Sequence, residues 1–598
     1  METLRKLHAL LTPRERRRGV LVLGLVLVMA GFEVVGVASV FPFFLTLSDP
    51  SLIQTNPTLS ALYEWGGFTE THGFLLALAL ATFTFLMLGA LVRSAGEYAM
   101  TRFVQMRRHS LGTRLIERYL RQPYAFFLGR HTGEMAKNIL AEVEQATMFA
   151  LAPVLRFATS VVTLVAILTF LVVMDPFIAG VSVLVLGTAY VAIFVTIRRL
   201  VTRNSSRRIA ADQARYTIAR EALGGIKDIR ILGKEDAYIR HFRAPSIEVS
   251  RMQAANLVLG QMPKYLVEAI GFGGMLLVCV ALLSTLPAGS SATAILPQLG
   301  VFAFAAYRML PSVQGIYRAM VEFRFGAGAV DVLYRDMTEL PDIAPPPRAQ
   351  NRLALHQALE LQDLRFCYDG STQGIDGLSL SIPAGSAIGV VGGTGAGKTT
   401  LIDLVLGLLT PSAGQICVDG VPITDANVKA WQSSIGYVPQ SIFLGDMSIA
   451  ENIALGTPAD QIDMARVRDC AQRAQLDQFI ETRLTDGYAT EVGEGGLRLS
   501  GGQRQRIGIA RALYHDPDIL VFDEATSALD AITERDVMKA IKGLQGTKTI
   551  LIIAHRLSTV ETCDRIIMLN EGRIVASGPY RDLIERNSSF QALAGVSP

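Results

Sequence analysis

The chain has 598 residues, of which 50% are hydrophobic and only 18% are charged, and its formal net charge is +3. This length is too great for one ordinary domain, and the excess of apolar residues indicates a membrane protein. The small net charge gives no sign of a nucleic-acid partner. The five cysteines are scattered without a CxxC spacing, which argues against a zinc site or a disulfide framework.

Six apolar stretches precede residue 325, and each is close to or longer than the roughly 20 residues that a helix needs to cross a bilayer. The predicted spans are residues 19–47, 73–99, 151–174, 177–198, 264–286 and 294–318. The first stretch is too long for the hydrophobic region of a signal peptide and has no clear cleavage site. We therefore expect it to be retained as a span.

Lysine and arginine follow an alternating pattern along the connections between these spans. The N-terminal arm and the connections at 100–150 and 199–263 are rich in both, whereas those at 48–72, 175–176 and 287–293 contain neither. Positive charge accumulates on the cytoplasmic side, so both termini are predicted to be cytoplasmic. A basic patch for nucleic acid is the alternative, but it would not alternate from one connection to the next.

The two long cytoplasmic connections mix charged and apolar residues at helical spacing. We expect spans two to five to continue beyond the bilayer as helices and to turn at tips near residues 126–134 and 221–227. The alternative is two solvated hairpins without a partner. Outside, residues 57–65 form either a short amphipathic helix on the membrane surface, where Tyr63 and Trp65 favour the interface, or a plain surface loop.

A proline-rich linker at 341–355 separates the predicted transmembrane domain, residues 1–340, from a soluble domain at 356–598. Consecutive prolines at 345–347 block a helix and keep the chain extended. Beyond the linker, strand-like and helix-like segments alternate, which is typical of an α/β domain.

The soluble domain contains the pattern G-x-x-x-x-G-K-[ST] between a predicted strand at 387–391 and a predicted helix at 400–406. Its residues are Gly392, Gly393, Thr394, Gly395, Ala396, Gly397, Lys398 and Thr399. Backbone N–H groups and a helix N-terminus in such a loop bind phosphate oxygens. Lys398 is predicted to reach the β- and γ-phosphates of a nucleotide, and Thr399 to bind Mg²⁺. A glycine-rich turn without function would not need this strand, lysine and threonine together.

A second apolar strand, residues 519–522, ends in two carboxylates. Asp523 is placed to hold Mg²⁺, and Glu524 is placed to polarise the water that attacks the γ-phosphate. Between the two strands, Ser500, Gly501, Gly502 and Gln503 precede a predicted helix at 504–513, which makes a second anion site.

These motifs, in this order, resemble the ATP-binding cassette family along the whole chain. The resemblance implies an exporter of the half-transporter type, an ATPase that couples hydrolysis of ATP with Mg²⁺ to transport. Its fold would be an α-helical six-span transmembrane domain with long cytoplasmic helical extensions, followed by an α/β P-loop nucleotide-binding domain.

The resemblance also implies roles for further residues. Tyr368 corresponds to the aromatic residue that stacks on adenine, although it is equally suited to a strand core. Gln440 corresponds to the glutamine that contacts Mg²⁺ and the attacking water, in a loop that receives the membrane-domain tips. Asp530 corresponds to a contact with the opposite subunit, and His555 to a contact with the γ-phosphate. Thr400 completes the predicted nucleotide contacts.

No substitution is visible at the catalytic positions, which predicts a homodimer with two competent sites. Each site would combine Lys398, Asp523 and Glu524 of one subunit with Ser500 and Gly502 of the other. Many exporters carry a longer side chain at the position of Gly495, just before the Ser500 motif, so this contact with the membrane domain is not expected here.

Residues 33–42, 221–235 and 300–312 resemble flippases for lipid-linked oligosaccharides of bacterial protein glycosylation. This resemblance implies flipping of a polyprenyl-diphosphate-linked glycan across the inner (plasma) membrane to its outer leaflet, with membrane lipids as surroundings. Export of another lipid, a drug or a peptide is the alternative within the class. An ATP-gated channel or regulator is the alternative from another class, and the six spans argue against a soluble cassette ATPase.

Arg308 lies about 14 residues into the sixth predicted span, which at about 1.5 Å per residue is about 21 Å below the outer boundary. An arginine at this depth is costly and usually faces a cavity or a partner. We therefore predict that Arg308 binds a diphosphate by charge-assisted hydrogen bonds. A structural ion pair with Glu33, at similar depth in the first span, is the alternative.

Overall fold

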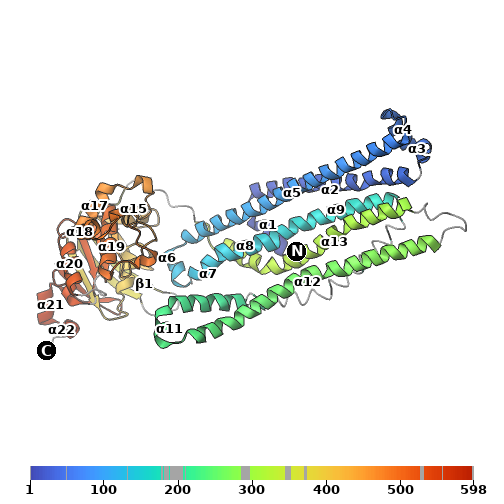
Figure 1. The fold of residues 1–598 in the computed structure, drawn as a ribbon. Helices are drawn as coiled ribbons and strands as arrows, with labels where there is room; N and C mark the ends of the chain where they lie inside the picture. The colour runs from blue at the N-terminus through green and yellow to red at the C-terminus, as the bar shows by residue number, and fades with distance from the viewer. Residues whose placement is uncertain are drawn as a thin grey trace. The chain divides into compact units, whose positions relative to one another are not determined.

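The computed structural model describes residues 2–48, 50–130, 132–174, 210–284, 296–343, 352–368, 374–524, 531–554 and 556–594, with isolated positions between 175 and 209 (Figure 1). The first half of the described chain is helical. The second half contains two sheets with helices between their strands.

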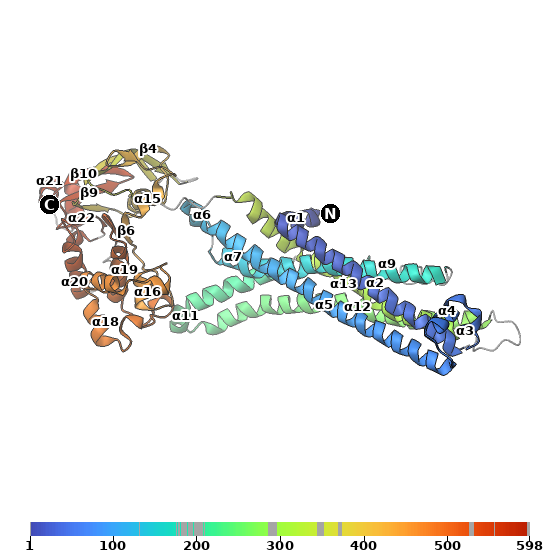
Figure 2. The same ribbon diagram turned by 90° about the horizontal axis from the view of Figure 1, so that it is seen from above.

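Long helices dominate the N-terminal half (Figures 1 and 2). Their bounds are α1 (Glu2–Leu10), α2 (Pro13–Ser48), α3 (Leu52–Thr55), α4 (Pro57–Trp65), α5 (Thr71–Leu120), α6 (Tyr124–Leu128), α7 (Thr132–Lys137), α8 (Val143–Ala146), α9 (Ala152–Met174), α11 (Ile226–Leu232), α12 (Glu235–Ser284) and α13 (Leu296–Glu339). Two π-helical turns, η1 (Asn138–Glu142) and η2 (Thr147–Leu151), join α7, α8 and α9 into one continuous run. Residues 210–224 are also helical.

Five of the six predicted spans coincide with helices α2, α5, α9, α12 and α13, and the predicted span at 177–198 lies almost entirely outside the described residues. Within the described chain, Pro13–Leu47, Thr71–Leu120 and Thr132–Val173 are long and apolar enough to cross a membrane. Helices α5 and α12 have 50 residues each. At 1.5 Å per residue each is about 75 Å long, so these helices extend well beyond a hydrocarbon core of about 30 Å, as predicted.

Three of the connections between these helices lie largely within the described residues. The predicted external segment is a helix, α4, and not a loop: the Asn56 side chain accepts hydrogen bonds from Thr58 and Leu59, and Pro57 starts the helix. The first of the two predicted tips contains the short helix α6. The second tip lies slightly later than predicted, because α11 follows Gly225 and the chain reverses at Gly233, whose φ of 60° suits glycine.

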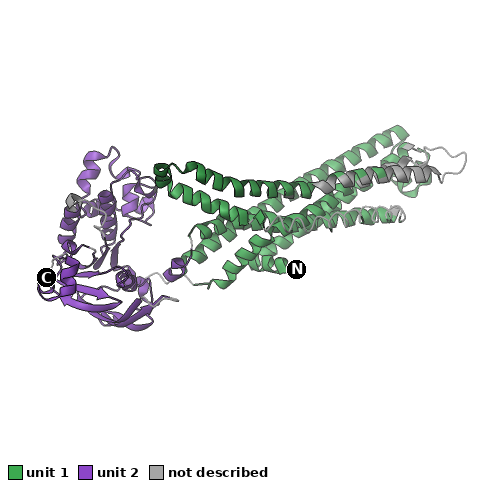
Figure 3. Ribbon diagram, turned by 90° about the horizontal axis from the view of Figure 1, so that it is seen from below, with its two compact units in different colours: residues 1–122, 131–343 green, residues 123–130, 344–598 purple. Residues whose placement is uncertain are grey.

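The chain divides into two compact units, Met1–Gln122 with His131–Ile343 and Pro123–Arg130 with Ala344–Pro598 (Figure 3). In the first unit, α2 packs against α5, α9 and α13, and α12 packs against α13. The short tip helix α6 groups with the second unit.

The second unit has a four-stranded antiparallel sheet in the order β2-β1-β4-β5 and a six-stranded sheet in the order β10-β9-β3-β8-β7-β6. Strands β9, β3, β8, β7 and β6 are parallel, and β10 pairs antiparallel at the edge. The strands are β1 (Ala358–Cys367), β2 (Gly374–Pro383), β3 (Ala387–Gly392), β4 (Ala413–Val418), β5 (Val421–Pro422), β6 (Ile435–Val438), β7 (Ile519–Asp523), β8 (Thr549–Ile553), β9 (Arg565–Asn570) and β10 (Arg573–Gly578).

Helices lie between these strands in the sequence, and the parallel strands are buried hydrophobic runs, as expected of a covered sheet. The helices are α14 (Lys398–Val405), α15 (Val428–Gln432), α16 (Ile449–Ile453), α17 (Met464–Arg473), α18 (Asp477–Arg483), α19 (Gly501–Tyr514), α20 (Ala531–Lys542), α21 (Tyr580–Arg586) and α22 (Ser588–Ala594), with short 3₁₀ turns at Ala459–Gln461, Gly487–Ala489, Glu494–Gly496 and Leu557–Thr559.

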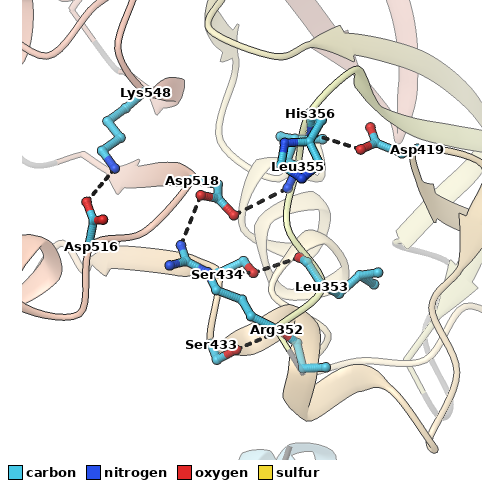
Figure 4. A network of polar contacts seen from close by, with 11 residues as sticks. Arg352, Leu353, Leu355, His356, Asp419, Ser433, Ser434, Asp516, Asp518 and Lys548 are labelled. Atoms are coloured by element: carbon cyan, nitrogen blue, oxygen red, sulfur yellow. Dashed lines mark hydrogen bonds and ion pairs between the residues drawn. The ribbon is translucent and has the colours of Figure 1, made fainter. Parts of the chain in front are cut away.

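A polar network holds the start of the second unit (Figure 4). The Arg352 guanidinium contacts Asp518 at 3.1 Å and donates a hydrogen bond to the Ser434 hydroxyl at 3.1 Å. The Ser434 hydroxyl donates to the carbonyl of Leu353 at 2.6 Å, and the Leu355 N–H donates to Asp518. The chain is therefore held to this unit from Arg352 onward, within the segment that the sequence assigns to the linker.

Candidate functional site

The predicted phosphate loop connects buried strand β3 to helix α14. Gly397 has φ 97° and is the N-cap of α14, and Gly395 has φ 81°, so both need the left-handed freedom of glycine. A Cβ on Gly392 would lie 2.3 Å from the carbonyl oxygen of Leu569. The three glycines thus let the loop turn sharply and run close to its neighbours.

Lys398 is buried, and its ammonium donates hydrogen bonds to the carbonyls of Gly392 at 2.9 Å and Gly393 at 3.0 Å. Burial lowers the pKa of Lys398, and the charges of Glu524 and Asp523 oppose this shift. Thr394 and Thr399 are exposed beside the loop, whereas Ala396 is buried and its carbonyl accepts from the Gly572 N–H. The lysine thus lies on the same side of the loop as the two predicted carboxylates.

Tyr368 follows the end of strand β1 and lies next to the loop. Its hydroxyl is 3.3 Å from the hydroxyl of Thr400, and its ring contacts Phe366 edge-to-face at 5.0 Å. The ring is half-buried against the core, and its hydroxyl reaches the first turn of α14 directly after the phosphate loop. This location is compatible with the predicted stacking on adenine and with a partial role in the core.

The two predicted carboxylates lie at the carboxyl end of β7. The Glu524 carboxylate accepts a hydrogen bond of 2.6 Å from the side-chain amide of Gln440, which follows β6. The Tyr437 hydroxyl, on β6, is 3.5 Å from Asp523. Glu524 has φ 48°, a left-handed conformation that is unfavourable for a glutamate. Neighbouring parallel strands therefore bring Gln440, Asp523 and Glu524 to one edge of the sheet.

The sequence did not identify Asp403, a buried carboxyl on α14 at this site. Burial, with a smaller contribution from the charge of Asp523, raises the pKa of Asp403 to about 6. Burial and the charges of Asp523 and Asp403 also raise the pKa of Tyr437. The pKa of Tyr124, on α6, is also raised, mainly by burial and to a smaller extent by the nearby charge of Asp403. A lone aspartate in a helix gives no sequence signal that its carboxyl is buried beside Asp523.

Ser500 is the N-cap of α19. Its hydroxyl accepts from the Gln503 N–H, and the Gln503 side chain accepts from the Ser500 N–H, which completes a capping box. Ser500 is exposed, and Gly501 and Gly502 form the first turn of the helix. In the part of the chain that the structure describes, each of these two side chains accepts a hydrogen bond from the other residue's backbone N–H, and neither bonds to the phosphate loop. Asp530 and His555 lie outside the described residues.

In the membrane half, Glu33 forms an ion pair of 3.6 Å with Arg93 of α5. Both line a cavity of about 70 Å³ together with Thr159, Ser160 and Ser312. Sequence reasoning missed Arg93 as a partner, although a charged residue inside the second predicted span was a usable signal. Arg308 lies in helix α13, and its side chain is outside the described residues.

Two family models match the chain: the ABC transporter transmembrane region over residues 22–286 and the ABC transporter model over residues 375–527. A protein of Ralstonia nicotianae described as an ATP-dependent lipid A-core flippase is 30% identical over 511 residues, which cover 84% of this chain and 85% of the relative. This chain belongs to the ABC transporter family. As an ABC exporter it is an ATPase that couples hydrolysis to transport, and the phosphate loop described above lies inside the matched nucleotide-binding region.

Other relatives support the assignment of this chain to the ABC exporters. A protein of Alkalilimnicola ehrlichii with the same description is 31% identical, over 81% of each chain, and one of Francisella tularensis is 29% identical, over 93% of this chain and 91% of the relative. A solved structure of a bacterial Atm1-family ABC exporter with ATP bound matches the fold with a TM-score of 0.78 and 24% identity, over 97% of this chain and 99% of that one. The helical membrane half followed by an α/β nucleotide-binding half is thus the fold of this exporter class.

Proposed function

We propose that this ABC exporter is a homodimeric, ATP-driven flippase for a glycolipid whose headgroup carries phosphate. The observation that carries the ATP-driven part is the contact between Gln440 and Glu524 beside the phosphate loop. It brings a water-orienting amide and a carboxylate base to the edge of the sheet where Lys398 would hold the γ-phosphate.

In this proposal Lys398 and the loop N–H groups bind the phosphates, and Tyr368 stacks on adenine. The oxygen donors of Thr399, Asp523 and Gln440 are the type that Mg²⁺ prefers, so these residues fit the cation that accompanies ATP. Mg²⁺ would supply neutralisation of charge on the phosphates. His555 would contact the γ-phosphate, and Glu524 would accept the proton of the attacking water.

The proposed homodimer follows from the location of Ser500. An exposed helix N-terminus with a satisfied capping box can accept an anion without losing its own hydrogen bonds. We infer that Ser500 to Gln503 complete the ATP site of a second copy, with Asp530 at the same interface. The predicted orientation, six spans with both termini in the cytoplasm, is part of the proposal.

For the cargo we propose a polyprenyl-diphosphate-linked oligosaccharide, flipped to the outer leaflet of the inner membrane. Support comes from the resemblance of residues 33–42 and 300–312 to flippases of that kind, and from Arg308 as a candidate diphosphate ligand. A lipid A-core type of glycolipid is the second candidate, because relatives that cover most of the chain carry that description. Both cargoes share an anionic, phosphorylated sugar headgroup on long acyl or prenyl chains.

A panel of lipids tests the cargo. The purified exporter in nanodiscs should hydrolyse ATP faster when polyprenyl-diphosphate-linked glycan is added. Lipid A-core would stimulate more strongly if the second candidate is right, and phosphatidylglycerol serves as an anionic lipid without sugar. Stimulation by phosphatidylglycerol equal to that by both glycolipids would contradict a glycolipid cargo.

A further inference from the structure

A cavity of about 190 Å³ lies within the first unit, apart from the Glu33 cavity. Its polar wall has the guanidinium groups of Arg208 and Arg318 and the amides of Gln145, Gln253 and Gln261. The carboxylate of Glu322 also lines the cavity, and the rest of the wall is apolar, with two phenylalanine side chains. A pocket with an apolar wall and a few convergent polar groups is the usual form of a binding site for a small ligand or headgroup.

Arg208 is the most unusual residue of this cavity. Its side chain is only 8% exposed, its guanidinium lies 4.3 Å from the centre of the Phe325 ring, and its contact with Asp212 is long, at 3.7 Å. Among the described residues, the Nε of Arg208 has no hydrogen-bond acceptor. The side-chain oxygen of Gln145 likewise has no hydrogen-bond donor. Buried polar groups are normally hydrogen-bonded, so an unsatisfied guanidinium N–H at a cavity indicates a ligand with acceptor oxygens.

The charges around the cavity are not balanced. Glu322 binds both Arg156 and Arg318 at 2.7 Å, and Asp212 binds Arg215 at 2.8 Å in addition to the longer contact with Arg208. Of the described residues that line the cavity, Arg208 and Arg318 are positive and Glu322 is negative, which leaves an excess of one positive charge. Such an excess in a partly apolar pocket favours a bound anion.

The backbone of the cavity wall is also specialised. Phe149 lies in the π-helical turn η2. Such turns are rare in proteins, and those that occur are often found at functional sites. The turn packs directly on Gly326 of α13, where an added Cβ would lie 2.5 Å from the Phe149 carbonyl. The π-turn and this glycine thus fix Phe149 in the wall next to Phe325.

The cavity lies where the predicted spans end on the cytoplasmic side. Arg318 is the last residue of the predicted sixth span, Gln261 precedes the fifth by three residues, and Phe149 precedes the third by two. This is the depth of the inner-leaflet headgroups when the predicted orientation is adopted. A lipid that waits to be flipped has its headgroup at this level.

We propose that this cavity binds the phosphate-bearing headgroup of a membrane amphiphile on the cytoplasmic side, with Arg208 and Arg318 as the anion ligands. The three glutamines would bind sugar hydroxyls, and the phenylalanine-lined wall would cover the first prenyl or acyl carbons. The proposal rests on the proposed flippase function. It adds an entry site that is distinct from Arg308, which is about ten residues deeper along α13.

The test compares two probes that differ only in charge. Polyprenyl diphosphate and the uncharged polyprenol are titrated into nanodiscs, and the concentration that half-stimulates ATPase is measured. Arg208→Ala leaves Asp212 with Arg215, and Arg318→Ala leaves Glu322 with Arg156, so neither variant strands a carboxylate. Arg108→Ala removes an arginine that pairs with Glu144 and does not line the cavity, and it serves as the matched control.

Loss of a charge-assisted hydrogen bond should raise the half-stimulating concentration of polyprenyl diphosphate about tenfold or more in both cavity variants. The value for polyprenol should not change, and Arg108→Ala should behave as wild type with both probes. A purely structural role for Arg208 and Arg318 would shift both probes equally and would overturn the proposal, as would no shift with the diphosphate.

The source of the phosphate is tested in the same assay. Inorganic pyrophosphate should neither stimulate nor compete at the same concentrations, because it lacks the apolar chain. If pyrophosphate replaced polyprenyl diphosphate equally well, the ligand would be a soluble anion and the lipid-headgroup site would be refuted. If no glycolipid or polyprenyl lipid stimulated the wild type, the proposed flippase function itself would fail.

Discussion

Glu524→Gln is the substitution that examines the proposed hydrolysis mechanism most closely. The structure shows the Glu524 carboxylate accepting a hydrogen bond of 2.6 Å from Gln440, while its backbone N–H donates to the Ile553 carbonyl at 3.0 Å. A glutamine has the same shape, and its amide oxygen can accept the same hydrogen bond. The substitution therefore removes the negative charge and the proton acceptor while it keeps the local packing.

The expected loss follows from this difference. Removing a positioned general base typically slows turnover by about 10²–10⁴-fold, which raises the activation barrier by about 3–5 kcal/mol. Binding of ATP should persist, because Lys398 and the phosphate loop are unchanged. The variant should therefore accumulate with ATP bound, as a closed dimer that size-exclusion chromatography of the nucleotide-binding half or cross-linking of the whole exporter can detect.

The assay is phosphate release at saturating ATP with Mg²⁺, combined with a measurement of retained nucleotide. Glu571→Gln is the matched control, since Glu571 is an exposed glutamate with a similar backbone conformation, φ 47°, in the loop between β9 and β10. It should keep turnover within about twofold. If Glu524→Gln hydrolysed ATP at a rate near wild type, Glu524 would not be the base.

Three further predictions concern cargo, electrostatics and coupling. Arg308→Ala should abolish flipping in a folded protein and Arg308→Lys should recover part of it, whereas rescue of transport by adding Glu33→Gln would identify a structural pair instead. Burial raises the pKa of Asp403 in the folded protein to about 6. Ionising this buried carboxyl therefore lowers the free energy of unfolding, fully above pH 6 and almost not at all below about pH 4. Asp403→Asn should therefore raise unfolding stability by about 3 kcal/mol at pH 7 and by almost nothing at pH 4, and an equal gain at both pH values would contradict this cause. Cysteines at Leu223 and Phe443, which are 74% and 67% exposed, should form a nucleotide-dependent cross-link if the second tip docks on the loop after Gln440, and absence of any cross-link in an active, otherwise cysteine-free protein would argue against docking.

The features that the sequence predicted are those that depend on residues close together in the chain. The strand, loop and helix around Lys398 depend on adjacent residues, and the structure has them at almost the predicted bounds. The long helices follow from uninterrupted apolar and helical patterns. For residues 57–65 the sequence left a helix and a loop open, and the structure has the helix α4 there. These features need no information from distant parts of the chain.

Features that combine distant segments were not predicted. The pairing of Glu33 with Arg93 depends on how two helices face each other, and hydropathy does not encode this. The Arg208 cavity collects residues from four segments, and the π-helical turn at Phe149 has no residue signature. Asp403 acquires its raised pKa only through burial beside Asp523. Tertiary packing, and not local propensity, creates each of these sites.

We propose that ATP hydrolysis by this chain moves a glycolipid from one leaflet to the other. The direct measurement uses proteoliposomes with the nucleotide-binding halves outside and a fluorescent polyprenyl-diphosphate-linked glycan in the outer leaflet, which corresponds to the cytoplasmic leaflet of the cell. ATP with Mg²⁺ should make the glycan inaccessible to a membrane-impermeant quencher, and Glu524→Gln should prevent this. Full accessibility of both this glycan and a lipid A-core probe after many turnovers of ATP would refute glycolipid flipping by this protein.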